Sequence, residues 1–386
     1  MSTPAANALI RFLRDQRGLV GDVPLHTPVF SGNERAYVLD CLDSTFVSSV
    51  GAYVTLFENE VARRSGCQFG IATVNGTAAL HALLHALDIG PGDLVLCPAL
   101  TFVATVNAIL YTGAEPLFLD ADEETLGLSV PAVAAFLGQC RITDGQAWHG
   151  NRRVRVCLPV HIFGHVIDVE ALNAFCQAVG VIVLEDAAES LGSMRNGRAA
   201  GSFGRAAAIS FNGNKIVTTG GGGCIVTNDE ALAVRLRHLT TTARVSQDWS
   251  FLHDEMGFNY RLPNLNAALG LAQMEPLDGV LAAKRALADH YDALFRDIPG
   301  VSFVHEPAGV TSNYWLQAIR VQDRGQRDAT LEALKTAGIQ ARPVWGLMPD
   351  LPYLAHCHVW GDLTVARRIE DTLINIPSSA WLMDPV

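Results

Sequence analysis

The sequence predicts an α/β fold, in which helices cover both faces of a mostly parallel sheet in a large domain that is followed by a smaller C-terminal α+β domain. Short apolar runs alternate with helical patterns from about residue 55 to 230, as in parallel strands joined by helices. A chain of 386 residues with 49% hydrophobic content can bury a large core in more than one domain. We expect an N-terminal segment and large domain over 1–265, then a linking helix and small domain over 266–386.

The expected strands are short runs rich in β-branched and other apolar residues. They are FGIATV (69–74), DLVLCPA (93–99), EPLFLD (115–120), RVRVCLPV (153–160), VIVLED (181–186), AAAISF (206–211) and GCIVTN (223–228). Helical patterns between them include GTAALHALLHALDIG and DVEALNAFCQAVG. After NYRLPNLNAALGLAQ a long helix is expected to about residue 297, followed by the mixed segments VSFVHE, YWLQAIRVQ, TLEALKTAG and IQARPVW.

The composition narrows the classes of protein to which the chain can belong. No apolar run approaches membrane-spanning length, and the opening stretch MSTPAANALIRFLRDQRG lacks the apolar segment of a signal peptide. The net charge of −11 argues against a nucleic-acid surface. The eight cysteines are scattered, without a C-x-x-C pair or a cluster with histidine. We therefore expect reduced thiols in a cytoplasmic protein and no metal site.

Three expected strands are followed by residues that suit a ligand, and open α/β sheets bind ligands at the carboxyl ends of their strands. Gly76, Thr77 and Ala78 open a helix whose free amides and dipole suit a phosphate, although Gly-Thr is also a common helix cap. Phe102 is expected either at the mouth of the site or in the core. Asp186 ends VIVLED, where a buried carboxylate needs either a protonated ring nitrogen or ordinary hydrogen bonds.

A fourth strand end carries one of only three lysines in the chain. Lys284 and Lys335 lie in helical, charge-dotted stretches, where a lysine is an ordinary solvated side chain. Lys215 follows Ser210 in AAAISFNGNKIVTTGGGGCIVTND, between two apolar runs and before four glycines. One interpretation is a loop lysine that caps carbonyl groups. The other is a desolvated amine that loses its proton and forms a Schiff base with a carbonyl, which arginine cannot do.

Taken together, the four strand ends favour a cofactor site. They supply a phosphate cradle, an aromatic face, an acid for a ring nitrogen and an amine for an aldehyde, which are the contacts that pyridoxal 5′-phosphate (PLP) requires. The four glycines do not fit a dinucleotide-binding loop, because they precede an expected strand and not a helix.

Motifs along nearly the whole chain resemble those of the DegT/StrS-type nucleotide-sugar aminotransferases. In the family's order they are GTAALH (76–81), PALTFVAT (98–105), PVHIFG (159–164), EDAAESLGS (185–193), GSFG (201–204), SFNGNKIVTTGGGG (210–223), GFNYRLPNLNAALGLAQ (257–273) and INIPSS (374–379). Each motif alone is a modest signal, and the set at these spacings is specific. The resemblance implies the aspartate-aminotransferase fold, which is fold type I of the PLP-dependent enzymes.

The resemblance also implies roles for individual residues. Lys215 would be the catalytic residue that holds the cofactor as a Schiff base, and Asp186 would face the pyridine nitrogen. Phe102 would lie on the ring face, where some relatives carry Trp. Cofactor contacts would also come from Gly76, Thr77, Ala78, Glu189 and Ser210. In a homodimer the neighbouring subunit would complete the phosphate site through Asn259-Tyr260-Arg261, with either Asn259 or Arg261 reaching the phosphate.

The substrate would be a nucleotide-linked keto sugar, and the amino donor L-glutamate. VPLHTPVFSGNERAYVLDCLDSTFVSSVGAYVTLFE and NRRVRVCLPVHIFGH resemble the bacillosamine and legionaminic acid subgroup, which aminates C4 of a 2-acetamido-2,6-dideoxy-4-hexulose. Ser48 and Ser49 would face the sugar, although both also suit an ordinary turn. Glu189, which is Gln in many relatives, and His161 are further expected substrate residues, and a structural role for His161 is the alternative. Two other functions stay open, a 3-keto sugar aminotransferase and a non-catalytic PLP-binding regulator.

Overall fold

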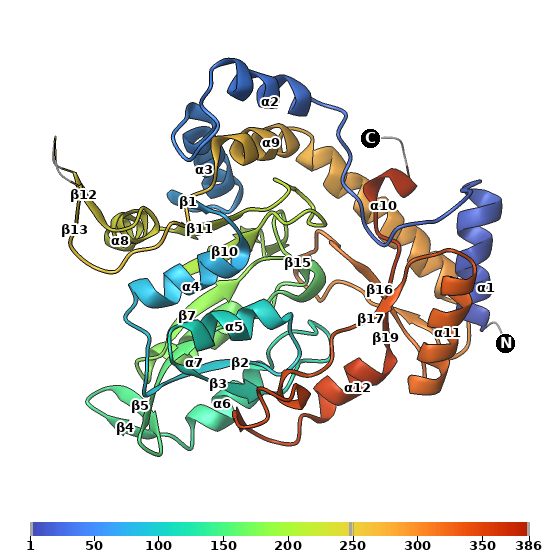
Figure 1. The fold of residues 1–386 in the computed structure, drawn as a ribbon. Coiled ribbons are helices and arrows are strands. Elements are labelled where there is room, and N and C mark those ends of the chain that lie inside the picture. The colour runs from blue at the N-terminus through green and yellow to red at the C-terminus, as the bar shows by residue number, and fades with distance from the viewer. Residues whose placement is uncertain (1–2, 247–248, 250, 384–386) are drawn as a thin grey trace.

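The computed structural model of the protein describes residues 3–246, 249 and 251–383. Its centre is a ten-stranded sheet, seen in the middle of Figure 1, whose main path runs β1–β11–β10–β7–β6–β2–β3–β18. Along this path the strands are β1 (Phe69–Thr73), β11 (Gly223–Thr227), β10 (Ala206–Ser210), β7 (Ile182–Asp186), β6 (Arg152–Cys157), β2 (Asp93–Pro98), β3 (Glu115–Leu119) and β18 (His358–Val359). The hairpin β4 (Arg141–Thr143) and β5 (Gln146–His149) extends the sheet from β6.

All seven expected strands are present, and the sheet is mostly parallel as predicted. Every neighbouring pair from β10 through β7, β6, β2 and β3 to β18 is parallel, while β11 runs antiparallel to both β1 and β10. The strand expected over 153–160 stops at Cys157. Pro159 has no N–H to donate to a ladder, and Val160 makes only an isolated bridge to Asp186. Gly223, the last residue of the glycine run, is the first residue of β11, so the run leads into a strand as expected and not into a helix.

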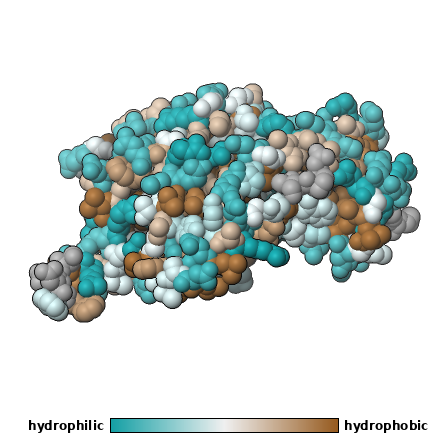
Figure 2. Space-filling view, turned by 90° about the horizontal axis from the view of Figure 1, so that it is seen from above, coloured by the Kyte–Doolittle hydropathy of each residue, from teal (hydrophilic) through white to brown (hydrophobic). Residues whose placement is uncertain are grey.

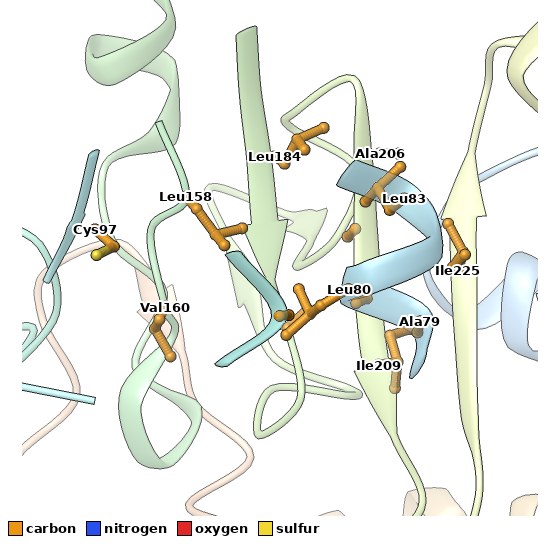
Figure 3. Close-up of a cluster of buried hydrophobic side chains, with 14 of the residues drawn as sticks. Ala79, Leu80, Leu83, Cys97, Leu158, Val160, Leu184, Ala206, Ile209 and Ile225 are labelled. Carbon is orange, nitrogen blue, oxygen red and sulfur yellow. The ribbon is translucent and has the colours of Figure 1, made fainter. Parts of the chain in front are cut away.

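Helices cover both faces of the sheet because successive residues of each strand point to opposite sides. Val95 and Cys97 face a core shared with α4 (Gly76–Ala86) and α5 (Val103–Tyr111). Leu94 and Leu96 face a second core with α6 (Val130–Leu137) and α7 (Val169–Gln177). Figure 3 shows the first core, with Leu80 and Leu83 of α4 beside Ala206, Ile209 and Ile225 of the sheet.

The C-terminal region has its own antiparallel sheet, in the order β14 (Ser302–Phe303), β16 (Gln317–Arg320), β19 (Leu373–Ile376) and β17 (Arg342–Pro343). Around it lie α10 (Leu277–Phe295), α11 (Arg324–Thr336) and α12 (Thr364–Thr372), at the right of Figure 1. The N-terminal helix α1 (Pro4–Arg11), with the π-turn Phe12–Gln16, packs into the same core as α10. The predicted domain division near residue 265 stays a prediction, and the structure adds that α1 joins the C-terminal side.

Several elements were not predicted from the sequence. Helices α2 (Glu34–Asp43) and α3 (Ala52–Arg64) pack with α9 (Asn264–Met274) at the top of Figure 1. After α8 (Glu230–Thr240), the hairpin of β12 (Arg244–Ser246) and β13 (Phe251–His253) projects from the left of the molecule. A small sheet joins β15 (Val310–Thr311) to β8 (Met194–Arg195) and β9 (Arg198–Ala199). Among the described residues no helix is both long and apolar enough to cross a membrane.

Candidate active site

A cavity of about 300 Å³ opens at the carboxyl ends of the parallel strands, where the large sheet faces the C-terminal region. Its volume lies at the lower end of the range typical of small-molecule sites. Seven residues expected in the site line this cavity, and they are Gly76, Thr77, Phe102, Asp186, Glu189, Ser210 and Lys215. The C-terminal region closes the other side with Trp315, Arg342 and Trp345.

Parallel pairing of β7 with β10 explains why distant parts of the chain meet here. Asp186, the last residue of β7, lies opposite Ala208, so Ser210 at the end of β10 emerges at the same edge. The chain then turns back to form β11, and Lys215 lies in that turn. One strand end therefore presents a carboxylate beside the hydroxyl and amine of the next.

The N-terminus of α4 forms the part of the cavity that suits an anion. Its N-cap Asn75 accepts a hydrogen bond from the Ala78 amide at 2.7 Å, so this predicted phosphate contact already has a partner inside the protein. Gly76 and Thr77, whose amides precede that of Ala78 in the first turn, line the cavity. A Cβ at Gly76 would lie 3.0 Å from Cβ of Ser210, so a side chain there would crowd the serine.

Asp186 is a buried carboxylate that lines the cavity, and no cationic side chain among the described residues is hydrogen-bonded to it. Thr105 donates its hydroxyl hydrogen to Oδ2 at 2.7 Å, and the Ala188 amide donates to Oδ1 at 3.1 Å. Burial raises the pKa of Asp186, and these two hydrogen bonds with the nearby Lys215 offset part of that rise. A positively charged ligand group beside the carboxylate would therefore be stabilised.

The Lys215 amine lies between a carboxylate and an aromatic ring. Its Nζ is 3.2 Å from Oε1 of Glu189 and 3.5 Å from the centroid of the Trp315 ring. Burial lowers the pKa of Lys215 and raises the pKa of Glu189, and their mutual attraction opposes both shifts. Burial thus favours the neutral form of each group, which for Lys215 is the form that attacks carbonyl carbon.

Glu189 is fixed by an unusual turn of the backbone. Its Oε2 accepts a hydrogen bond from the Phe163 amide at 2.9 Å, and Phe163 has φ 54° and ψ 15°, a left-handed conformation that is rare for a bulky residue. Such strained positions cluster at functional sites. The turn holds the Glu189 carboxylate against the lysine, so Glu189 contacts the Lys215 amine directly.

Phe102 and His161, the other two expected side chains near the strand ends, differ in exposure. Phe102 is 51% exposed at the mouth of the cavity, with its ring centroid 6.1 Å from that of Trp345. His161 is fully buried and does not line the cavity. Its Nε2 lies 2.8 Å from Oε2 of Glu185, whose carboxylate also accepts backbone hydrogen bonds from Gly201, Phe203 and Gly204. This position favours the structural interpretation of His161 over a direct contact with substrate.

The expected sugar contacts Ser48 and Ser49 lie away from this cavity, as do Asn259 and Arg261, which were expected to serve a neighbouring subunit. Ser49, Asn259 and Arg261 line a separate polar cavity of about 450 Å³ with three threonines and Arg244. The Ser48 carbonyl accepts a hydrogen bond from the Asn264 amide. Within one chain these residues and Lys215 are therefore not brought together.

Sequence reasoning missed the contribution of the C-terminal region and misjudged one lysine. Trp315, Arg342 and Trp345 lie in segments that were interpreted only as part of a mixed α+β region, and no spacing rule connects them with the strand ends. The expectation that Lys284 is solvated is wrong, because its side chain has no exposed surface. The signal was present, since the buried positions of α10 include Leu277, Leu287 and Tyr291, and helical periodicity places residue 284 on the same face.

Comparisons with known proteins agree with this geometry. A family model described as the DegT/DnrJ/EryC1/StrS aminotransferase family matches residues 29–384. The chain is 38% identical over 357 residues to the GDP-perosamine synthase of Escherichia coli O157:H7, covering 92% of this chain and 93% of that one. It is 36% identical over 321 residues to EpsN of Bacillus subtilis (strain 168), named as a pyridoxal phosphate-dependent aminotransferase, covering 83% and 81%. The crystal structure of the aminotransferase TlmJ from Streptoalloteichus hindustanus superposes with a TM-score of 0.84 at 28% identity, over 93% and 94% of the two chains.

Proposed function

Because the chain belongs to the DegT/DnrJ/EryC1/StrS aminotransferase family and is thus a PLP-dependent sugar aminotransferase, we propose that it transfers the amino group of L-glutamate to C4 of a nucleotide-linked 4-keto-6-deoxyhexose. The observation that carries this proposal is the joint placement of Lys215 and Asp186 in one cavity with the N-terminus of α4. An aminotransferase needs an amine for the aldehyde of the cofactor, an acid for its ring nitrogen and donors for its phosphate.

The residues that line the cavity fit PLP in size and in chemistry. The amides of Gly76 and Thr77 and the hydroxyl of Ser210 would bind the phosphate, while Asp186 would pair with the ring nitrogen. The exposed ring of Phe102 would cover one face of the cofactor ring. When bound, PLP supplies a sink for the electron pair that is released at the carbon bearing the amino group.

The chain's own contribution to the reaction is to hold and move protons. Asp186 would keep a proton on the ring nitrogen, because within the described part of the chain its carboxylate accepts hydrogen bonds only from neutral donors. Nζ of Lys215 would take a proton from Cα of the amino donor and deliver it to the cofactor carbon that carried the aldehyde. With the sugar as substrate the same amine would move a proton in the reverse direction. This role requires an unprotonated amine, which the burial of Lys215 favours.

Arg342 supports an α-amino acid as the donor. Its guanidinium lines the cavity and forms no hydrogen bond or ion pair with any residue that the structure describes. Burial lowers the pKa of Arg342, and the negative charge of Glu189 opposes that shift in part. An unpaired cation beside a cavity is stabilised by an anionic ligand, and a guanidinium matches a carboxylate with two parallel hydrogen bonds. The carboxylate of L-glutamate would supply that partner.

Two candidate sugars are favoured by different observations. The names of the relatives favour a GDP-linked sugar, since three GDP-perosamine synthases are 33–38% identical and each match covers 92–94% of this chain. The segments DSTFVSSVG and NRRVRVCLPVHIFG favour a 2-acetamido-2,6-dideoxy-4-hexulose. A site with donors for an acetamido carbonyl loses binding free energy when that group is absent, because its buried polar groups then lack partners.

A comparison of the half-reactions tests both candidates. The pyridoxamine form of the enzyme is mixed with the GDP-linked 4-keto precursor of perosamine or with the nucleotide-linked 2-acetamido sugar, and the absorbance of re-formed PLP is followed. We expect a higher specificity constant for the GDP-linked sugar. Preference for the 2-acetamido sugar would reverse the order of the candidates, and preference for a 3-keto isomer would contradict amination at C4.

We also propose a homodimer in which each subunit completes the site of the other. Seven large hydrophobic residues are exposed along α2, its flanking loops and α3, and they are Phe30, Leu39, Leu42, Phe46, Val47, Val50 and Leu56. Phe46, Val47 and Val50 flank Ser49, which lines the polar cavity with Asn259 and Arg261. The carbonyl of the adjacent Ser48 accepts a hydrogen bond from the Asn264 amide of α9. Figure 2, which views the molecule from the side of α2 and α9, shows small groups of hydrophobic residues among hydrophilic ones on this face. The seven exposed hydrophobic residues on and around α2 are typical of a contact surface.

We further propose a cytoplasmic location, because the free state of all eight cysteines suits a reducing compartment.

A further inference from the structure

Trp315 contacts the Lys215 loop in two independent ways. The face of its ring lies 3.5 Å from Nζ of Lys215, measured to the ring centroid. Its indole Nε1 donates a hydrogen bond to the carbonyl of Asn214 at 2.7 Å. One side chain of the C-terminal region thus holds both the amine and the backbone just before it.

Trp315 is itself held in place by the surrounding polypeptide. Its side chain is 2% exposed, and its amide donates to Oδ1 of Asn313 at 2.8 Å. Nδ2 of Asn313 donates to the carbonyls of Glu189 and Leu191, both at 2.9 Å. The segment that positions the indole is therefore bonded to the segment that carries Glu189, the other neighbour of the lysine amine.

A close contact at Gly164 and the buried side chain of Lys284 also restrain Trp315. Gly164 has φ 101°, and a Cβ at this position would collide with Oδ1 of Asn313. The segment that leads to Trp315 can therefore pack against the turn beside Phe163 only because residue 164 is glycine. From the opposite side, Nζ of Lys284 donates to the carbonyls of Trp315 at 3.1 Å and Ser378 at 2.5 Å. Trp315 thus has little freedom to leave the lysine.

We propose that Trp315 is a positioning residue, whose ring face holds the ammonium of Lys215 whenever that amine is not bonded to the cofactor. This inference rests on the proposed role of Lys215. In an aminotransferase the lysine is released in each half-reaction and must then stay close to the reacting carbon. An aromatic face attracts an ammonium ion more strongly than a neutral amine, and it restricts the many rotamers of a free lysine.

Other charged groups also influence the protonation of the Lys215 amine. Glu189 and Asp186 favour the ammonium form, whereas Arg342 from β17 disfavours it. His26 of the N-terminal segment is near enough to sense the charges of both Lys284 and Lys215. Replacing Trp315 leaves all of these charged groups in the chain. Trp315→Phe loses the Nε1 hydrogen bond to the Asn214 carbonyl but keeps a ring, so comparing it with Trp315→Leu separates the effect of the ring face from that of the hydrogen bond.

The scarcity of lysine makes a direct measurement possible. Protein labelled with carbon-13 at the lysine ε position should give three resonances, from Lys215, Lys284 and Lys335. They are titrated in the pyridoxamine form, where the Lys215 amine is free, for wild type, Trp315→Phe and Trp315→Leu. The exposed Lys335 serves as the internal reference, and a Lys215→Ala sample assigns the resonance of Lys215.

We expect Trp315→Leu to lower the titration midpoint of Lys215 by about one pH unit, a tenfold change in its protonation equilibrium. Trp315→Phe keeps an aromatic face and should give a smaller shift in the same direction, with Lys335 unchanged. Wild-type midpoints for Lys215 in both variants would overturn the inference. If Trp315→Leu does not fold, an unshifted midpoint in Trp315→Phe together with an unchanged ε-carbon shift overturns it. Failure of the proposed function would look different, because borohydride would then attach the cofactor to a residue other than Lys215.

Discussion

Thr105 donates its hydroxyl hydrogen to Oδ2 of Asp186 at 2.7 Å, so the buried carboxylate at the end of β7 is met by a neutral donor and, over the residues that the structure describes, by no bonded cation. A hydroxyl orients the carboxylate without neutralising it, and the negative charge stays available to a ligand in the cavity. The pair joins two strand ends, because Thr105 lies in α5, which follows β2.

Asp186→Asn should slow the proton-transfer step by several powers of ten while PLP stays bound. The amide has nearly the size of the carboxylate but carries no charge to keep the ring nitrogen protonated. Single-turnover absorbance changes with L-glutamate measure the effect. Thr105→Val is the matched control, since it removes the hydrogen bond and keeps the charge, so its loss should be much smaller. An Asn variant with half-reaction rates near those of wild type would refute this role of Asp186.

Arg342→Gln should weaken the binding of L-glutamate by roughly 10- to 150-fold, the range expected when a hydrogen-bonded charge of about 1.5–3 kcal/mol is lost. Arg324→Gln is the control, because Arg324 is an exposed arginine that pairs with Asp371. The measurement is the dependence of the first half-reaction on glutamate concentration. Unchanged glutamate dependence, or an equal loss in the half-reaction with the sugar, would contradict a donor-binding role.

The sequence predicted one side of the site well, and the reasons are local. Strands such as AAAISF are recognised by β-branched and apolar runs, and their carboxyl ends then meet because the sheet is parallel. Asp186, Ser210 and Lys215 followed from that rule and from the family motifs. Ala78 is different, because the Asn75 cap occupies its amide, and helix capping had been weighed only as an alternative.

The other side of the site depends on tertiary structure. Trp315 and Arg342 reach the cavity because the C-terminal sheet docks against the large one, and nothing in their own segments encodes that approach. The parallel pairing of β18 with β3 was missed for the same reason, since a two-residue strand carries no periodicity.

The free energy of unfolding should depend on pH through Lys284. Burial lowers the pKa of Lys284 to about 7 in the folded protein, against about 10.4 for an unfolded chain. Between these values the unfolded chain binds more protons, so this contribution to stability is fully present above pH 10.4 and is lost as the pH falls toward 7.

Relative to Lys284→Met, wild type should therefore gain about 2–3 kcal/mol between pH 7 and pH 9, at up to about 1.4 kcal/mol per pH unit. Denaturant unfolding at several pH values gives this difference. The exposed Lys335 provides the control, because Lys335→Met should show no such slope. A difference between wild type and Lys284→Met that stays constant with pH would mean that Lys284 keeps an ordinary pKa.

Mixed dimers test whether the active site is shared between subunits. Lys215→Ala and Arg261→Ala should each be inactive or strongly impaired, and mixing them should restore part of the activity, because a hybrid dimer contains one intact site. Exchange of subunits is followed with a size-distinguishable tag. Absence of recovery after demonstrated exchange would count against the shared site, provided that Arg261→Ala alone is impaired.

The central claim is that Lys215 is the amine that bonds the cofactor, and borohydride reduction of the PLP-loaded enzyme tests it most directly. Peptide mapping has only three lysines to distinguish, which are Lys215, Lys284 and Lys335. We predict the pyridoxyl group on the peptide that contains Lys215, and no labelling and no turnover in Lys215→Arg, because a guanidinium cannot form the imine. Labelling of Lys284 or Lys335 in the wild-type enzyme would contradict the claim.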